Sequence, residues 1–168
     1  WIARGDPVHK GSPLALLAQV LRRTADVHDG DPPEAAFRKL RARVARHVAA
    51  DAAGRVSEFL GELCGVATRA TASPQLRAAL ENPVLMGDQL RRAWEDFVTA
   101  ECTAHPVVLV VEDLHWGDLP TTRFIDAALR RAAELPLLVV ALARTEVDEL
   151  FPGLWVERAL TQIRLTEL

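Results

Sequence analysis

The 168-residue chain has the length and composition of one globular domain, and both exclude several classes of protein. Hydrophobic residues make up 49% and charged residues 26%, so the chain can bury a core and is not a disordered tail. A formal net charge of −3 argues against nucleic acid as a partner. No apolar run approaches the roughly 20 residues that span a bilayer, and the start has no leader-like pattern. A cytoplasmic protein without a membrane partner is therefore expected.

The two cysteines, Cys64 and Cys102, lie within apolar helical patterns and show no CxxC spacing. A disulfide framework or a zinc site built on them is not expected, and two buried thiols are. The chain begins at Trp1, without Met, in what reads as the middle of a strand. We therefore expect it to be part of a larger protein.

The first two thirds of the chain are predicted to be mainly helical. Trp1–Pro7 predicts a short strand that ends at a Gly/Pro break. Helical spacing of apolar residues then predicts a helix opened by Ser12-Pro13 with Ser12 as N-cap, and further helices over about 34–50, 52–67 and 86–104. A shorter helical turn or two is predicted after Ser73-Pro74.

Lys39, Arg43 and Arg46 fall opposite the apolar face of the helix predicted over 34–50. Such a run fits either a patch for nucleic acid or an acidic partner, or the solvated face of an amphipathic helix. The negative net charge favours the solvated face.

The last third changes character. The apolar runs Pro106–Val111 and Leu135–Ala143 flank a helix predicted over about 121–134, introduced by Asp118-Leu119-Pro120. Continuously apolar strands joined by a helix are typical of parallel pairing in a sheet that is covered on both faces. Ile163–Thr166 alternates and predicts a further strand. The fold class is therefore predicted to be α/β.

Adjacent carboxylates, Glu112 and Asp113, directly follow the valine-rich strand. They lie at the carboxyl end of that strand, where open α/β sheets bind ligands. In a nucleotide-hydrolysing site one such acid holds Mg²⁺, usually through water, and the other orients or deprotonates the attacking water. The alternative is an acidic helix cap or a surface turn.

Arg144 directly follows the next apolar run. Its guanidinium is planar and always charged, which suits it to contact a terminal phosphate. Alternatively, it caps the strand or pairs with Glu112 or Asp113.

The string Glu112-Asp113-Leu114-His115-Trp116-Gly117-Asp118 resembles the Walker B region of STAND and AAA-like P-loop ATPase modules of bacterial signalling proteins. Together with Leu90–Ala104, Ala141–Val147 and Phe151–Trp155, it resembles more specifically the modules fused downstream of a serine/threonine protein kinase domain in bacterial multidomain regulators.

This resemblance implies a role for each site residue. Glu112 takes the place of the Mg²⁺-side acid, Asp113 that of the catalytic acid, and Arg144 that of the phosphate sensor. Many relatives place Asp first, so the division of labour between the two acids stays open. His115 is either catalytic or a structural imidazole beside its neighbouring tryptophan, and Asp118 is expected to cap the following helix.

The sequence contains no GxxxxGK followed by Ser or Thr, the loop that cradles phosphates. In the family that loop and its strand lie just before the equivalent of Trp1, and a helical lid follows the fifth strand. The resemblance thus implies a partial domain over 1–168: an incomplete P-loop NTPase-type parallel sheet, from the second to the fifth strand, with a helical insertion over about 12–104.

Two functions follow from this reading. The first is a fragment of a signalling ATPase that binds ATP and Mg²⁺ in the intact parent, where the rest of the parent polypeptide is the partner. Without the loop this chain is expected to be inactive and to bind no nucleotide tightly. The second is a nucleotide-free interaction module in which the acids only cap structure and the helical segment docks partners.

The resemblance also predicts geometry. Glu112, Asp113 and Arg144 should lie at one edge of one sheet. The strand Pro106–Val111 should pair with both Trp1–Arg4 and Leu137–Ala143. Because the family's first strand sits between the fourth and fifth, Ile163–Thr166 should be unpaired, displaced, or separated from the sheet by a gap.

Overall fold

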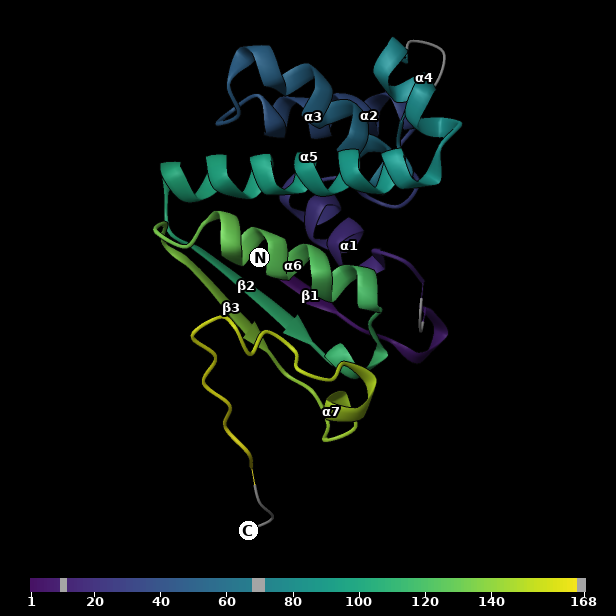
Figure 1. The fold of residues 1–168 in the computed structure, drawn as a ribbon. Helices are drawn as coiled ribbons and strands as arrows, with labels where there is room; N and C mark the ends of the chain where they lie inside the picture. The colour runs from purple at the N-terminus through teal and green to yellow at the C-terminus, as the bar shows by residue number, and fades with distance from the viewer. Residues whose placement is uncertain (10–11, 68–71, 166–168) are drawn as a thin grey trace.

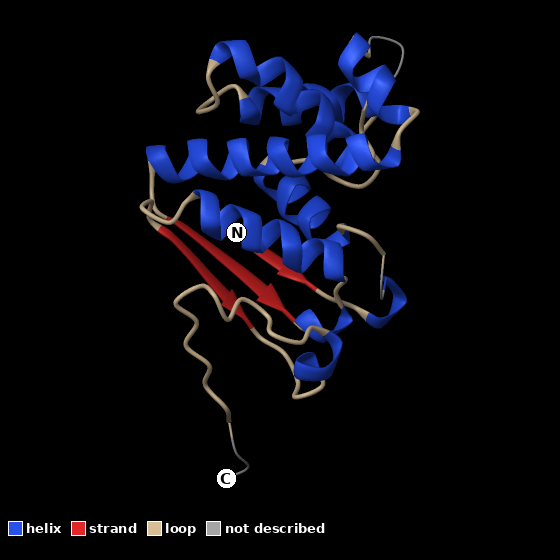
Figure 2. Cartoon of the chain, viewed as in Figure 1, coloured by secondary structure: helices blue, strands red, loops and turns tan. Residues whose placement is uncertain are grey.

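A computed structural model describes residues 1–9, 12–67 and 72–165. These residues form a three-stranded parallel sheet with helices stacked on one face (Figures 1 and 2). The strands are β1 (Ile2–Arg4), β2 (Val107–Glu112) and β3 (Leu137–Ala141). The helices are α1 (Ala15–Thr24), α2 (Pro33–Val44), α3 (Ala50–Leu63), α4 (Pro74–Leu80), α5 (Pro83–Ala104), α6 (Leu119–Arg131) and α7 (Val147–Leu150), with 3-10 turns η1 (Pro7–His9) and η3 (Leu114–Trp116). The predicted α/β class is confirmed. Among the described helices, even the 22-residue α5 lacks the hydrophobicity that a bilayer-spanning helix requires.

Strand β2 is the centre of the sheet and pairs in parallel with both neighbours, in the order β1-β2-β3. Ile2 lies opposite Val110, and Val107 lies opposite Leu137. The amide of Leu142 continues the second ladder with a 2.8 Å bond to the Val111 carbonyl. The predicted pairing of β2 with both other strands is confirmed.

The predicted strand at Ile163–Thr166 is wrong over its described part. Residues 163–165 have no regular structure, and Ile163 and Leu165 are 79% and 93% exposed. Alternating side chains do not form a strand when no neighbouring strand supplies hydrogen bonds. The expectation that this segment does not pair with β3 holds for 163–165, and Thr166 lies outside the described residues.

One face of the sheet packs on the helices, and the other is open. Ala3, Val107, Leu109 and Val111 point to the helical side and are at most 3% exposed. Their alternate neighbours point the other way and are 36–57% exposed: Ile2, Val108, Leu138, Val140 and Leu142. In the described ranges the helices lie on the first face only (Figure 2). The expectation of a sheet covered on both faces is therefore wrong for these residues, although both faces are apolar.

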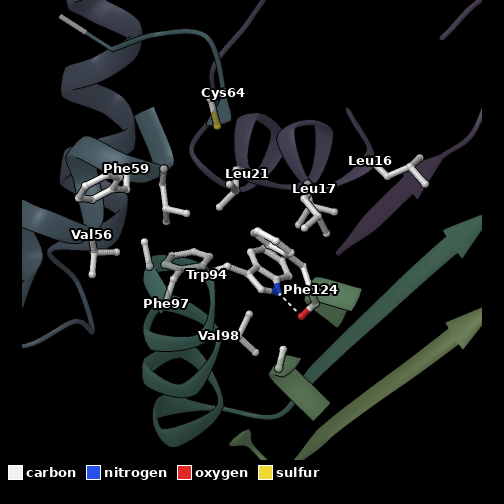
Figure 3. Packing of buried hydrophobic residues seen from close by; sticks show 14 of the residues in the cluster. Leu16, Leu17, Leu21, Val56, Phe59, Cys64, Trp94, Phe97, Val98 and Phe124 are labelled. Carbon is white, nitrogen blue, oxygen red and sulfur yellow. Dashed lines mark hydrogen bonds between the residues drawn. The ribbon is translucent and has the colours of Figure 1, made fainter. Parts of the chain in front are cut away.

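The core lies between the sheet and the helical layer, and α5 runs through it (Figure 3). Trp94 is fully buried, and its Nε1 donates a 3.1 Å hydrogen bond to the Phe124 carbonyl of α6. Phe97 stacks on the ring of Trp1, with centroids 5.6 Å apart. The aromatic residues of α5 thus join the helical layer to α6 and to the start of β1.

Helix termini depart from the sequence expectations where polar side chains act at a distance. Ser12 does not cap α1, which begins at Ala15 after Leu14 in a left-handed conformation (φ 60°). The amide of Leu14 instead donates to Asp118, 3.2 Å away and remote in sequence. Helix α5 begins at Pro83, earlier than predicted, because the Asn82 side chain accepts hydrogen bonds from the first-turn amides.

The helices predicted over 34–50 and 52–67 also shift. The first ends at Val44, and α3 starts at Ala50, within the span expected for the first. Helix α3 stops at Leu63, because Gly65 takes a positive φ of 68° and the Val66 amide bonds back to the Gly61 carbonyl. This left-handed glycine is a common helix terminator.

The solvated face predicted for Lys39, Arg43 and Arg46 is wrong at Arg43. Arg46 is exposed, but Arg43 is buried and forms a two-pronged ion pair with Glu101 of α5, which has no exposed surface. A buried cation needs such a partner, and a helical wheel cannot show one on another helix. Burial alone would raise the pKa of Glu101, but hydrogen bonds from Arg43 and His47 outweigh burial and lower it.

Both cysteines are free and buried, as the sequence predicts. Burial raises the pKa of the Cys64 thiol to about 12. Burial and the nearby charge of Glu101 raise that of Cys102 to about 11. Both thiols are therefore protonated at neutral pH, which makes them poor nucleophiles.

Replacing Trp94 with alanine should destabilise the fold by about 3–5 kcal/mol, because it empties the centre of the core and removes the hydrogen bond from Nε1 to the Phe124 carbonyl. The matched control on the same helix is Val84→Ala, whose side chain is 77% exposed and should matter by less than about 0.5 kcal/mol. Urea denaturation measures both free energies, and similar losses for the two variants would contradict this core.

Candidate functional site

The carboxyl ends of the three strands form one edge, and charged residues gather there. Arg4 of β1 lies opposite Glu112 of β2, and Val111 lies opposite Ala141. Arg144 follows β3 by three residues, and its amide donates a 3.4 Å hydrogen bond to His115 of η3. Glu112, Asp113 and Arg144 therefore lie at the same edge on neighbouring strands, as the geometric prediction requires.

Both acids lie close to Arg4, a cation that the sequence analysis did not place at this site. Arg4 Nε lies 2.9 Å from Glu112 Oε2 and 3.9 Å from Asp113 Oδ2. The side chains of Arg4, Glu112 and Asp113 are 64%, 31% and 48% exposed, and pairs as exposed as these contribute only about 0–1 kcal/mol. The pair is thus weak enough to open for a ligand. The sequence did contain a signal for this contact: Arg4 ends the strand that is predicted to pair with Pro106–Val111, and Glu112 directly follows that run.

Asp113 occupies a tight turn at the end of β2. Its backbone is left-handed, with φ 53° and ψ 43°, a conformation that aspartate tolerates better than most residues. Two hydrogen bonds hold the turn: the Trp116 amide donates to the Asp113 carbonyl, and the Leu114 amide donates to the Leu142 carbonyl, both at 2.9 Å. The turn leaves the Asp113 carboxylate at the surface of the edge.

Gly5 is required by this turn. Its amide donates a 2.8 Å hydrogen bond to the Glu112 carbonyl. A Cβ at position 5 would stand 2.4 Å from the Asp113 carbonyl oxygen and 3.0 Å from Cβ of Trp116. The chain after β1 therefore passes against the acidic turn at a distance that only glycine allows. From the sequence, Gly5 showed only as a break in the strand.

His115 is a buried residue that follows β2 and contacts the segment after β3. The ring is buried, lies 4.9 Å from the Trp116 ring, and accepts the Arg144 amide at Nδ1. Its Nε2 has no hydrogen-bond partner among the described residues. These contacts favour the structural reading of His115.

Asp118 caps α6, as predicted. Its Oδ1 accepts the amides of Thr121 and Leu14, and its Oδ2 accepts the Thr121 hydroxyl at 2.6 Å. With these partners the buried carboxylate also holds the start of α1 against the start of α6.

A cavity of about 510 Å³ lies beside this edge, on the β1 side. Arg4, Gly5, Trp116 and Gly117 line it together with residues of α1. Its lining includes neither Arg144 nor any residue of β3, the strand beside which the resemblance puts the phosphate loop. A second cavity, about 630 Å³, lies in the helical layer between α2, α3 and α4, remote from the acids.

Substituting Gly5 with alanine should destabilise the chain by about 1–3 kcal/mol, because the added methyl group overlaps the Asp113 carbonyl. The same change at Gly87 of α5, where a Cβ meets nothing within 4 Å, should instead stabilise by about 0.5–1 kcal/mol. Thermal denaturation of the two variants checks this. A neutral or stabilising Gly5→Ala would mean that the turn is not packed as described.

Comparison with known proteins identifies the family of this chain. The sequence matches the AAA ATPase domain family over residues 3–140, a span that holds β2, both acids and most of β1 and β3. Arg144 lies beyond the matched span. No curated protein and no solved structure matches the chain. Because the match covers most of the 168 residues, the chain belongs to the AAA ATPase domain family.

Proposed function

We propose that this chain is the acid-bearing part of an ATP-hydrolysing domain, and that a strand carrying the phosphate-binding loop completes the domain beside β3. The observation that carries the proposal is the open side of the sheet: among the described residues, no strand pairs with the outer edge of β3, and none of the helices covers the apolar sheet face next to the acids.

The free edge of β3 offers unused backbone groups. Leu142 gives its amide to Val111 and accepts the Leu114 amide, so both its backbone groups point to β2. Because backbone groups alternate in direction along a strand, Leu138 and Val140 also point to β2. The amides of Val139 and Ala141 then point to the open side. A parallel strand added there would satisfy them.

The uncovered face calls for a covering element. Ile2, Val110 and Val140 stand in register across the three strands, and Val108 stands beside Leu138. Soluble proteins rarely leave so contiguous an apolar surface open unless another element or a partner covers it. Continuous valine and leucine in β2 and β3 fit strands that are buried on both faces.

The handedness of strand connections suggests what covers this face. From β1 to β2 to β3 the chain steps across the sheet in one direction, and the connecting helices α5 and α6 lie on the same face (Figure 1). A strand beyond β3 that precedes β1 in sequence would return across the sheet in the opposite direction. Since parallel crossovers are right-handed, the helix in that return lies on the other face. The helix that follows a phosphate loop would therefore cover the open apolar face.

A loop in that position would stand beside Arg144 and near Glu112 and Asp113. In AAA ATPases generally, ATP is bound with Mg²⁺. The two partly exposed carboxylates fit Mg²⁺, which prefers oxygen ligands and keeps several of its waters. We assign one acid to the ion's water shell and the other to the attacking water, and we assign Arg144 to the terminal phosphate. Arg4 would then release Glu112 or share it.

We further propose that the parent is a bacterial signalling ATPase of the STAND type linked to a serine/threonine kinase domain. The support is the resemblance of the string Glu112–Asp118 and the segments around it. The polypeptide sequence preceding Trp1 in the parent tests this directly: it should contain the GxxxxGK loop and, further upstream, a kinase domain.

The runner-up is a nucleotide-free docking module, which the open apolar face also favours, because such faces bind proteins as well as helices of their own chain. It differs from the first proposal in needing no ATP at any length of the polypeptide.

MgATP titration separates the two functions. The 168-residue chain should bind MgATP weakly or not at all, because a phosphate loop supplies several charge-assisted hydrogen bonds, each contributing about 1.5–3 kcal/mol. The parent polypeptide should bind and hydrolyse it. In the parent, Asp113→Asn should lower hydrolysis by about 10²–10⁴-fold, the scale of general acid–base catalysis, while changing affinity much less. Calorimetry and phosphate release measure the two effects.

A matched control in the same parent is Asp88→Asn, an acid on α5 whose side chain is 56% exposed and which should leave both quantities unchanged. Tight binding or steady turnover by the 168-residue chain alone would place the site elsewhere. A parent that never binds MgATP would leave the docking module as the better account.

A further inference from the structure

Three potential metal ligands meet at the amino end of β2, the opposite end from Glu112 and Asp113. His47 comes from the segment between α2 and α3, Glu101 from the last turn of α5, and His105 from the end of that helix. His47 Nδ1 lies 2.9 Å from Glu101 Oε1, and His105 Nε2 lies 3.3 Å from Glu101 Oε2. The ligand atoms of the three residues all lie within 4.8 Å of one another.

The carboxylate at the centre is held in a fixed orientation. Glu101 has no exposed surface, and Arg43 donates to both of its oxygens from one side. One histidine nitrogen contacts each of the same two oxygens. Fixed carboxylates of this kind are typical where outer partners orient a metal ligand.

The histidines combine access with the right spacing. Their side chains are 28% and 44% exposed, so an ion can reach them from solvent although Glu101 is buried. Glu101 and His105 are four residues apart at the end of α5, which puts them on one face. Bonds of 2.0–2.2 Å around a tetrahedral zinc ion separate its ligand atoms by roughly 3.4 Å. The observed 3.3 Å is close to that separation, and the observed 2.9 Å is about 0.5 Å shorter.

The ring of His105 is also contacted at its other nitrogen. Its Nδ1 lies 3.3 Å from the carbonyl oxygen of Pro106. A second partner of this kind orients the ring, so that Nε2 faces an oxygen of Glu101.

We propose that His47, Glu101 and His105 form a site for a divalent transition metal ion of the zinc class. Two imidazoles and one carboxylate select such ions over Mg²⁺ and Ca²⁺, which prefer all-oxygen sites. Three protein ligands leave one position for water. The charge of Arg43 opposes the incoming ion, so the site binds more weakly than the closed four-ligand sites of zinc-dependent folds.

The site acts on stability and not on ATP chemistry. Strand β2 separates it from Glu112 by about 16–20 Å. An ion there ties the segment between α2 and α3 to the point where α5 passes into β2. It would therefore fix the helical layer to the base of the sheet, independently of the nucleotide function proposed above.

Zinc titration by calorimetry tests the proposal on the 168-residue chain. One equivalent of Zn²⁺ should bind and raise the melting temperature. His47→Asn and His105→Asn, which keep a hydrogen-bond donor for Glu101, should each weaken binding by more than tenfold, because loss of a mere outer partner already costs about 10–100-fold. The control is His28→Asn. His28 is exposed and contacts Asp26 away from the cluster, so this variant should bind zinc like the unmodified 168-residue chain.

Cobalt(II) supplies a second readout that does not depend on stability. Bound at this site, it should give the intense visible absorption of a four-coordinate ion, and His47→Asn should abolish it. Failure of the unmodified chain to bind zinc would overturn the proposal. So would equal binding by all three histidine variants, and the cluster would then be only an ion pair of Arg43 and Glu101 with two histidine donors.

Discussion

The structure depends on the parallel pairing of β2 with a strand on each side. Val107, Leu109 and Val111 bury one face of β2 under α5 and α6, while both ladders fix its register against β1 and β3. Because all three strands run the same way, their carboxyl ends meet at one edge, and Arg4, Glu112 and the segment leading to Arg144 arrive there together. The proposed chemistry rests on this edge, which the carboxyl ends of the strands form.

The same pairing explains which parts of the fold could be predicted from the sequence. Valine-rich runs predict buried parallel strands whatever their neighbours are, and the order of the three strands followed from the resemblance to P-loop ATPases. Local patterns failed where distant residues decide the outcome. Asp118, more than 100 residues away, binds the amide of Leu14 and leaves Ser12 without a capping role. Glu101 draws Arg43 into the interior, 58 residues from it in sequence. Ile163–Leu165 has the alternation of a strand, but no strand pairs with it in the part of the chain that the structure describes.

In the candidate site, too, some residues could be predicted from the sequence and others could not. The shared location of Glu112, Asp113 and Arg144 could be predicted from the sequence, because these residues follow apolar runs and the carboxyl ends of parallel strands share an edge. Arg4 and Gly5 were missed as site residues, since their roles arise only when β1 lies against the acidic turn. The cluster of His47, Glu101 and His105 had no sequence signal at all beyond the four-residue spacing of the last two, because its third member joins through the packing of separate helical segments.

The central claim is that a strand of the parent pairs with β3, beside Arg144 and the acids. Amide hydrogen exchange, read residue by residue along β3, tests it most directly. In the 168-residue chain, Leu138 and Val140 should be protected by β2, whereas Val139 and Ala141 should exchange quickly, because their amides point to the open side. In the parent polypeptide all four should be protected. If Val139 and Ala141 exchange as quickly in the parent as in this chain, no strand completes the sheet at β3, and the account of the site is wrong.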